Sequence, residues 1–285
     1  MLGRYFIGHS DALPWLPGVD LRKRYNRGPR HIDVYMTYRR LLSTLLLTLL
    51  MVAFPACAGQ ARIAVASNFG EVARLLAAEY ARQSGHDIQV STASTGKLYA
   101  QISHGAPFDV LLSADATTPR ILVRQGLAVE ASLHDYAIGR LVLWSRQPGL
   151  VHDGQALLRA GTFNRLAIAN PQLAPYGAAA RELLQHLGRW DALQPRLVLG
   201  ENVGQAMQFT FTGNADVGLL PRSLVLEAQK KVGGSSWLVP QQQHQPIVQT
   251  AVLLVRAKAN PAARGFLAYL RSDTARAVIR AHGYD

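Results

Sequence analysis

Cysteine and acidic side chains are the residues that this chain has least of. One cysteine, Cys57, occurs in 285 residues, so disulfide bonds play no part in the fold. The chain has 30 Lys and Arg but only 18 Asp and Glu, which gives a formal net charge of +12. The basic residues are scattered along the chain and form no stripe. Their charge therefore predicts a mild attraction for anions and not a nucleic-acid-binding surface.

The motifs of several enzyme classes are also missing. The sequence contains no H-E-x-x-H pair for zinc, no G-x-S-x-G for a hydrolase nucleophile, and no complete P-loop around S-T-G-K. We expect His86, His104 and His244 at the surface or in turns. Asp109 and Asp115 flank a strand end, where we expect them to cap local structure and not to act as an acid–base pair. The sequence therefore predicts no catalytic residues and no enzyme.

Residues 36–58 have the organisation of a secretory signal. Two arginines precede an apolar run at 41–54, and the Ala-Cys-Ala triplet after it fits the rule for peptidase cleavage. The run is shorter than the about 20 residues that a helix needs to cross a bilayer. We predict cleavage before Gly59 and export to the periplasm. The alternative is lipidation of Cys57, although the flanking residues fit a lipoprotein signal poorly.

Residues 1–35 precede this signal. A secretory signal starts close to the first residue of a chain, and here it starts at Met36. We expect residues 1–35 to be a non-native extension from a start codon assigned too far upstream, with no part in the fold.

Short apolar strands alternate with amphipathic helices after the signal. Strands are predicted at 62–66, 87–92, 108–113, 140–145, 165–170, 196–200, 216–220 and 251–256. Helices are predicted at 69–83, 97–103, 117–125, 177–187, 203–212, 222–230, 262–271 and 273–281. This alternation predicts an α/β fold with parallel strands.

The alternation loosens at 146–161 and again at 232–249, where Gly, Pro and Gln gather. The two breaks predict two lobes, each with a central β-sheet. The first part of lobe I would be residues 59–140, and lobe II would be residues 141–249. The chain would then return to lobe I at residues 250–285.

Four strand-to-helix junctions carry short polar side chains or a tyrosine. They are Ser67-Asn68, Ser94-Thr95-Gly96, Tyr176-Gly177 and Asn202-Val203-Gly204. Each junction offers the free N–H groups of a helix start, and two junctions fall in each predicted lobe. Ligands of α/β sheets bind at the carboxyl ends of strands, so the four junctions together predict a cleft for a small oxyanion. Taken alone, each junction is more simply a helix cap, and Tyr176 a packing residue.

Long runs of the chain resemble one family. The runs are VASNF, STASTGKLYAQISHGAPFDVLLSAD, AIGRLVLWS, LAIANPQLAPYGAAARELLQHLGRWDALQPRLVLGENVGQA and FLAYLRSDTARAVIRAHGY, within residues 61–285. They resemble the periplasmic molybdate-binding proteins of bacterial ABC importers. The resemblance implies a type II, Venus-flytrap fold of two α/β lobes, with molybdate or tungstate held between them by uncharged donors. It also implies delivery to an inner-membrane ABC permease by a monomer without a cofactor, a protein–cation ligand or a nucleic-acid partner.

The anion contacts of the family can be placed on this chain one by one. The hydroxyl-bearing residue after the first strand falls on Ser67, with Asn68 beside it. The second serine-rich loop falls on Ser94 and Thr95, of which Thr95 matches better. The backbone contact at the start of a second-lobe helix falls on Val203.

A tyrosine contact differs between two branches of the family. One branch carries it in a GIVYGSD-like segment, which here reads VGLLPRS and has Pro221 at the tyrosine position. The other branch carries it in an N-P-x-x-A-P-Y-G segment, which here supplies Tyr176. The resemblance therefore implies the second branch, with Tyr176 as an anion contact.

Other functions on a similar fold fit the sequence less well. A ferric carrier needs converging tyrosines and acids, and a phosphate carrier benefits from an acceptor carboxylate, but the four junctions supply neither set. Sulfate remains an alternative ligand, because it differs from molybdate mainly in size. The secretion signal and the missing helix-turn-helix disfavour the sensor domain of a transcription regulator.

Overall fold

The computed structural model describes residues 59–285, together with residues 36, 38 and 39. Residues 1–35 and, apart from those three, the predicted signal segment lie outside the described residues. Within the described part, no helix combines the length and the apolar character needed to cross a membrane.

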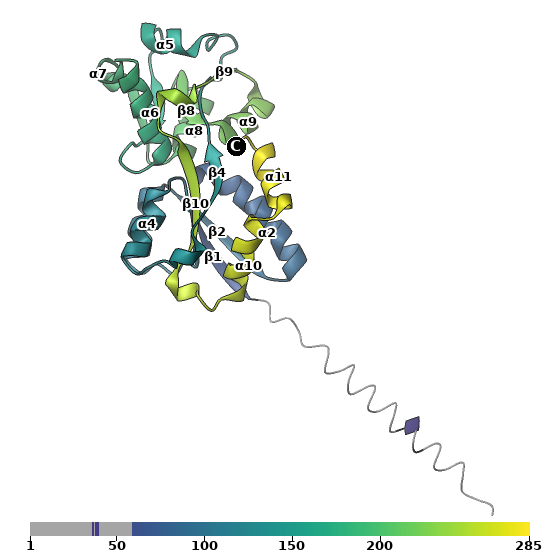
Figure 1. Cartoon of the computed structure of the whole chain (residues 1–285). Helices are drawn as coiled ribbons and strands as arrows, with labels where there is room; N and C mark the ends of the chain where they lie inside the picture. The colour runs from purple at the N-terminus through teal and green to yellow at the C-terminus, as the bar shows by residue number, and fades with distance from the viewer. Residues whose placement is uncertain (1–35, 37, 40–58) are drawn as a thin grey trace, which may run out of the picture. The chain divides into compact units, whose positions relative to one another are not determined.

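Two five-stranded sheets, each in its own lobe, form the frame of the fold (Figure 1). The first sheet has the order β2-β1-β3-β10-β4, and the second has the order β7-β6-β8-β5-β9. The strands of the first are β1 (Gln60–Ala66), β2 (Asp87–Ala93), β3 (Val110–Ser113), β4 (His134–Gly139) and β10 (Ile247–Leu253). Those of the second are β5 (Leu141–Ser145), β6 (Leu166–Ala169), β7 (Leu197–Gly200), β8 (Val217–Pro221) and β9 (Ser235–Leu238). The predicted α/β fold with a central sheet in each of two lobes is confirmed.

Each sheet contains one strand that runs against its neighbours, so the sheets are mixed and not wholly parallel. Strand β10 pairs antiparallel with β3 and β4, and β5 pairs antiparallel with β8 and β9. Only Arg140 separates β4 from β5, so the chain passes from one sheet to the other in extended form.

The sequence analysis did not predict β4 and β9, and it placed the start of β10 four residues too late. Both missed strands lie at the edge of a sheet. An edge strand is partly exposed and tolerates polar residues, so its hydrophobic signal is weak. Here β9 alternates half-buried and exposed residues, and β4 begins with His134 and Asp135.

Helices cover both faces of each sheet, as strands that are buried on both sides require. The helices of the first lobe are α2 (Gly70–Ser84), α3 (Thr95–Ser103), α4 (Thr117–Arg124), α10 (Pro261–Leu270) and α11 (Asp273–Ala281). Those of the second lobe are α5 (Gly154–Ala160), α6 (Pro175–His186), α7 (Trp190–Leu193), α8 (Val203–Phe211) and α9 (Arg222–Val232). Short 3₁₀ helices are η2 (Ser67–Phe69), η3 (Glu130–Ser132), η4 (Gln194–Arg196), η5 (Gln241–Gln243) and η6 (Val255–Ala257). Along β1, Ile63 and Val65 belong to the core with α2, α10 and α11, while Ala64 belongs to the core with α3 and α4.

Candidate functional site

One small cavity brings all four predicted junctions together. Its lining residues are Ala66, Ser67, Asn68, Ser94, Thr95, Ala114, Ala174, Pro175, Tyr176, Asn202 and Val203. The first lobe contributes the ends of β1, β2 and β3, and the second lobe contributes the starts of α6 and α8. The cavity therefore lies between the lobes, at the carboxyl ends of the parallel strands, where α/β folds place their ligands.

The cavity is small, and most of its lining residues are buried. Its size suits one compact group and not an organic ligand. Contacts between the lobes surround it. The Gly96 N–H donates to the Leu173 carbonyl at 2.9 Å, and Lys97 Nζ lies 2.5 Å from Glu201 Oε1.

The turn after β1 presents Ser67 and Asn68 to the cavity. The backbone leaves the strand at Ala66 and forms η2, whose first N–H groups have no partner within that helix. The Asn68 side chain is already engaged, because Nδ2 donates to Gln249 Oε1 at 2.9 Å and to Tyr284 Oη at 3.1 Å. Asn68 can therefore offer a ligand its backbone N–H but no free amide hydrogen.

The loop after β2 supplies two buried hydroxyl groups. Ser94 occupies the N-cap position of α3 but does not cap it, and its Oγ is buried with no hydrogen-bond partner among the described residues. Thr95 Oγ1 accepts the Ala114 N–H at 3.2 Å, which leaves its own hydrogen free to be donated. Buried polar atoms are normally paired, so the Ser94 hydroxyl indicates a place where an acceptor is expected.

Helix α6 brings Tyr176 into the cavity wall. The helix starts at Pro175, and a Cβ at Gly177 would collide with the Ala169 carbonyl, so only glycine lets α6 approach the end of β6 this closely. Tyr176 is 1% exposed, and its hydroxyl lies against Gly139. Burial raises the pKa of Tyr176 well above its usual range, so the phenol stays protonated and can donate.

Asn202 and Val203 form the start of α8. The Asn202 side chain accepts the N–H groups of Gly204 at 2.9 Å and Gln205 at 3.1 Å. This cap satisfies the second and third N–H groups of the helix, while the first, that of Val203, has no partner within the helix. Val203 lines the cavity, so its N–H is placed to serve a ligand.

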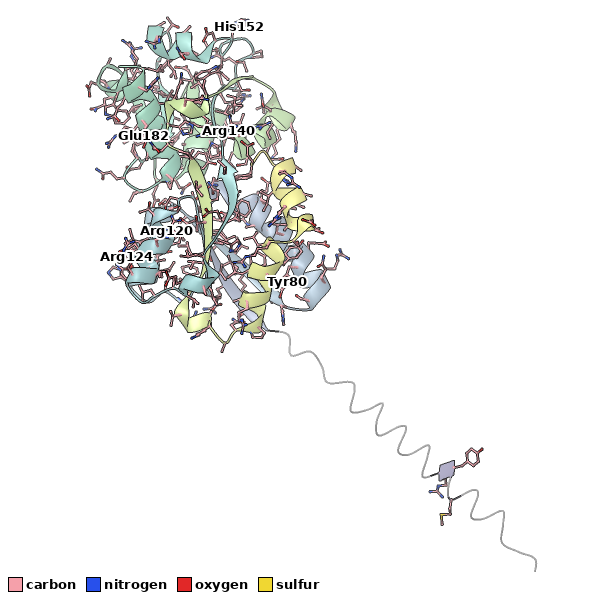
Figure 2. All side chains as sticks on the ribbon, viewed as in Figure 1. Tyr80, Arg120, Arg124, Arg140, His152 and Glu182 are labelled. Atoms are coloured by element: carbon pink, nitrogen blue, oxygen red, sulfur yellow. The ribbon has the colours of Figure 1, made fainter. Side chains whose placement is uncertain are left out.

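The cavity lining carries no formal charge. The helix starts that meet there bring positive partial charge, which favours an anion without a cationic side chain. Basic residues such as Arg120 and Arg124 lie on the exposed face of α4 instead (Figure 2). Within residues 36, 38, 39 and 59–285, no group of three or more His, Cys, Asp or Glu is placed to hold a metal ion.

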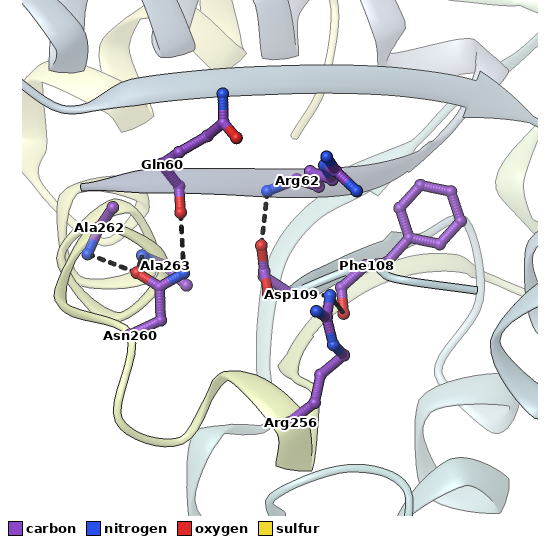
Figure 3. A network of polar contacts seen from close by, with 8 residues as sticks. All are labelled: Gln60, Arg62, Phe108, Asp109, Arg256, Asn260, Ala262 and Ala263. Carbon is purple, nitrogen blue, oxygen red and sulfur yellow. Dashed lines mark hydrogen bonds and ion pairs between the residues drawn. The ribbon is translucent and has the colours of Figure 1, made fainter. Parts of the chain in front are cut away.

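The two aspartates considered from the sequence have structural partners. Asp109 Oδ2 accepts the Arg62 N–H at 2.7 Å, and Oδ1 pairs with Arg256 at 3.3 Å (Figure 3). This brace lies near the start of β1, whereas the cavity lies beyond the end of that strand. Asp115 accepts the N–H and the hydroxyl of Thr118 at the start of α4, and burial raises its pKa.

Sequence reasoning missed the apolar wall of the cavity and the partners of Asn68. Ala66, Ala114, Ala174 and Pro175 complete the lining but carry no signal of binding, because alanine and proline lack side-chain donors. The replaced tyrosine position, Pro221, pairs with Leu141 at the end of β8 and does not line the cavity.

Comparison with known proteins gives the class first. The profile of the family described as bacterial extracellular solute-binding protein matches residues 61–285, and the chain belongs to this family.

Relatives within that class are molybdate-binding proteins. The molybdate-binding protein ModA of Azotobacter vinelandii is 45% identical over 232 residues, which cover 80% of this chain and 92% of the relative. ModA of Rhodobacter capsulatus is 44% identical over 242 residues, which cover 85% and 94%. The solved periplasmic molybdate-binding protein of A. vinelandii matches with a TM-score of 0.76 at 40% identity, over 79% of this chain and 98% of that chain. The resemblance drawn from the sequence runs is confirmed.

Proposed function

We propose that the chain captures molybdate, and tungstate as well, between its lobes and delivers it to an ABC permease of the inner membrane. The observation that carries the proposal is the cavity of uncharged donors between the lobes, in whose wall the buried Ser94 hydroxyl has no hydrogen-bond partner among the described residues. Relatives at 44–45% identity are molybdate-binding proteins, which supports molybdate as the anion.

Each predicted contact has a defined donor in this proposal. Ser67, Ser94, Thr95 and Tyr176 donate their hydroxyl groups, while Val203 donates its backbone N–H. Because both amide hydrogens of Asn68 are engaged, Asn68 contributes only through the backbone. Molybdate is bound as an oxyanion, so no side chain coordinates the metal directly and no cofactor takes part. Oriented N–H dipoles stabilise the dianion in a cavity that excludes bulk water.

Binding and closure are coupled in this mechanism. The first lobe, which contains β1–β4 and β10, and the second lobe, which contains β5–β9, each supply part of the donor set. The anion therefore binds the closed form more tightly than the open form and shifts the equilibrium towards closure. The lining offers no nucleophile with an adjacent base, which supports transport without catalysis.

Calorimetric titration with molybdate, tungstate, sulfate and phosphate in parallel tests the proposal. We expect strong binding of molybdate and tungstate. We expect weak binding of phosphate, because the described lining of the cavity includes no carboxylate to accept its proton. If sulfate competes equally with molybdate, the proposal of a molybdate carrier fails and a sulfate carrier takes its place.

The exported form is proposed to be a periplasmic monomer that begins at Gly59. The sequence supports cleavage there, because an Ala-Cys-Ala triplet precedes that residue. The intact mass of protein exported by a bacterial host distinguishes this form from one lipidated at Cys57.

A further inference from the structure

The turn Ser67–Phe69, which carries two of the proposed contacts, is held by a buried cluster of hydrogen bonds. The Asn68 carbonyl accepts the Tyr284 hydroxyl at 2.8 Å and the Ser223 hydroxyl at 3.1 Å. The Asn68 amide donates to Gln249 and Tyr284. Ser223 Oγ and Tyr284 Oη also lie 3.1 Å apart. Both ends of the Asn68 residue, side chain and carbonyl, are therefore fixed by other segments.

These partners come from three distant parts of the chain. Gln249 lies on β10, Tyr284 follows α11, and Ser223 lies at the start of α9 in the second lobe. The bond from Ser223 to Asn68 therefore joins the second lobe to the binding turn of the first. Neither Ser223 nor Tyr284 lines the cavity.

The position of Tyr284 is itself well defined. Its ring packs edge-on against Phe69 with centroids 5.4 Å apart. The next residue, Asp285, exchanges two backbone hydrogen bonds with Ile138 of β4, at 2.8 and 3.0 Å. The Asp285 carboxylate also pairs with Arg140 at 2.7 Å. The contacts of Asp285 fix the end of this segment to β4, and the Tyr284 hydroxyl is held against the turn.

We propose that Tyr284 and Ser223 are positioning residues for the anion site. Tyr284 holds the turn in the shape that presents the donors of Ser67 and Asn68, and Ser223 ties that turn to the second lobe when the lobes close. A binding turn that is fixed before the ligand arrives loses less conformational freedom on binding, so its affinity is higher. This inference rests on the proposed function.

Three variants test the inference: Tyr284→Phe, Ser223→Ala and the double variant. Ser223→Ala removes one neutral hydrogen bond to Asn68 and Tyr284→Phe removes two, and we expect molybdate affinity to fall about 3- to 10-fold in each variant. In Ser223→Ala the loss should come from faster dissociation with a nearly unchanged association rate, because the Ser223 bond joins the two lobes and therefore acts on the closed form. The double variant should lose less than the product of the single losses, because both hydroxyl groups serve one carbonyl.

Tyr269→Phe is the matched control. Tyr269 lies on α10 against the first-lobe core, and its buried hydroxyl has no partner among the described residues. Its removal should leave molybdate affinity at the unmodified value.

Unchanged affinity and dissociation rate in Tyr284→Phe and Ser223→Ala, with only lower melting temperatures, would overturn the inference and leave the cluster a purely structural one. If Tyr284→Phe does not fold, Ser223→Ala decides alone. If the unmodified protein binds another oxyanion and not molybdate, the proposed function fails, and the same variants are compared with that anion. Binding of none of the four oxyanions would overturn both.

Discussion

Single side chains at the cavity differ in what their polar groups already do. Asn68 donates its amide hydrogens to Gln249 and Tyr284, while Thr95 Oγ1 accepts an N–H and still has its hydroxyl hydrogen to donate. Ser94 has no partner at all among the described residues. Ser94 and Tyr176 therefore separate a binding site from ordinary helix capping most clearly.

Tyr176→Phe removes one hydroxyl group and keeps the packing of the ring. Hydrogen bonds to charged groups contribute about 1.5–3 kcal/mol, so molybdate affinity should fall roughly 10- to 100-fold. The melting temperature without ligand should barely change, because the ring contacts remain. Isothermal titration calorimetry measures the affinity. Unchanged affinity in the folded variant would show that the tyrosine only packs.

Ser94→Ala should lower molybdate affinity without lowering the stability of the protein, whereas most substitutions of buried residues lower stability. The Oγ is buried with no partner in the described part of the chain, and an unsatisfied buried polar group costs about 1–3 kcal/mol. Its removal should leave the free energy of unfolding without ligand equal or higher, while molybdate affinity falls about 10-fold or more. Urea unfolding with and without molybdate measures both quantities. A variant that is less stable without ligand and binds normally would contradict a ligand role for this hydroxyl.

At the scale of elements, the cavity is lined mainly by residues at the starts of helices, and a helix start has a local sequence signal. Ser67-Asn68, Ser94-Thr95 and Asn202-Val203 could be predicted because a polar residue between an apolar strand and an amphipathic helix marks a junction. The carboxyl-end rule then predicted that the junctions lie near one another.

Other features depend on contacts far apart in sequence and could not be predicted. The edge strands β4 and β9 have weak apolar patterns, and the antiparallel pairs β5–β8 and β10–β3 join segments far apart in the sequence. The partners of Asn68 lie 155 to 216 positions away, so no local pattern reports them. The sequence could therefore not predict that Gln249 and Tyr284 already engage the Asn68 side chain.

Asn202→Ala tests whether the start of α8 serves the ligand. Loss of an N-cap costs about 1 kcal/mol, and fraying should misplace the Val203 N–H and weaken molybdate binding about fivefold. Asn260→Ala is the matched control, because Asn260 caps α10 through two backbone N–H groups far from the cavity. The control should lose comparable stability and keep its affinity, as thermal unfolding and calorimetry would show. Equal losses of affinity in both variants would mean that global stability, and not the helix start, controls binding.

At the scale of the whole molecule, the charged side chains of the protein lie away from the cavity and do not form its lining. The formal net charge is +12, yet no basic or acidic residue lines the cavity. The overall field attracts anions towards the protein, and the closed cavity of fixed dipoles holds one of them. Added salt should therefore lower the association rate constant and leave the dissociation rate constant nearly unchanged.

The pH dependence of binding follows from the same separation. Among the described residues that line the cavity, Tyr176 is the one titratable side chain, and burial raises its pKa, so molybdate affinity should stay constant from about pH 6 to pH 9. Burial also raises the pKa values of Tyr136 and Tyr284. A raised pKa means stability that is complete below the unfolded value near 10 and is lost as the pH rises above it. Calorimetry from about pH 6 to pH 9 measures the affinity, and thermal unfolding from about pH 8 to pH 12 measures the loss of stability. A step in affinity between about pH 6 and pH 9 would contradict the absence of another titrating group from the described lining.

The most direct measurement is a crystal structure of the protein with molybdate, with data collected at the molybdenum absorption edge. We expect one strong anomalous peak inside the cavity, with anion oxygens within hydrogen-bond distance of the Ser94 and Tyr176 hydroxyls and the Val203 N–H. A peak elsewhere on the protein, or an empty cavity at saturating molybdate, would contradict the proposed site.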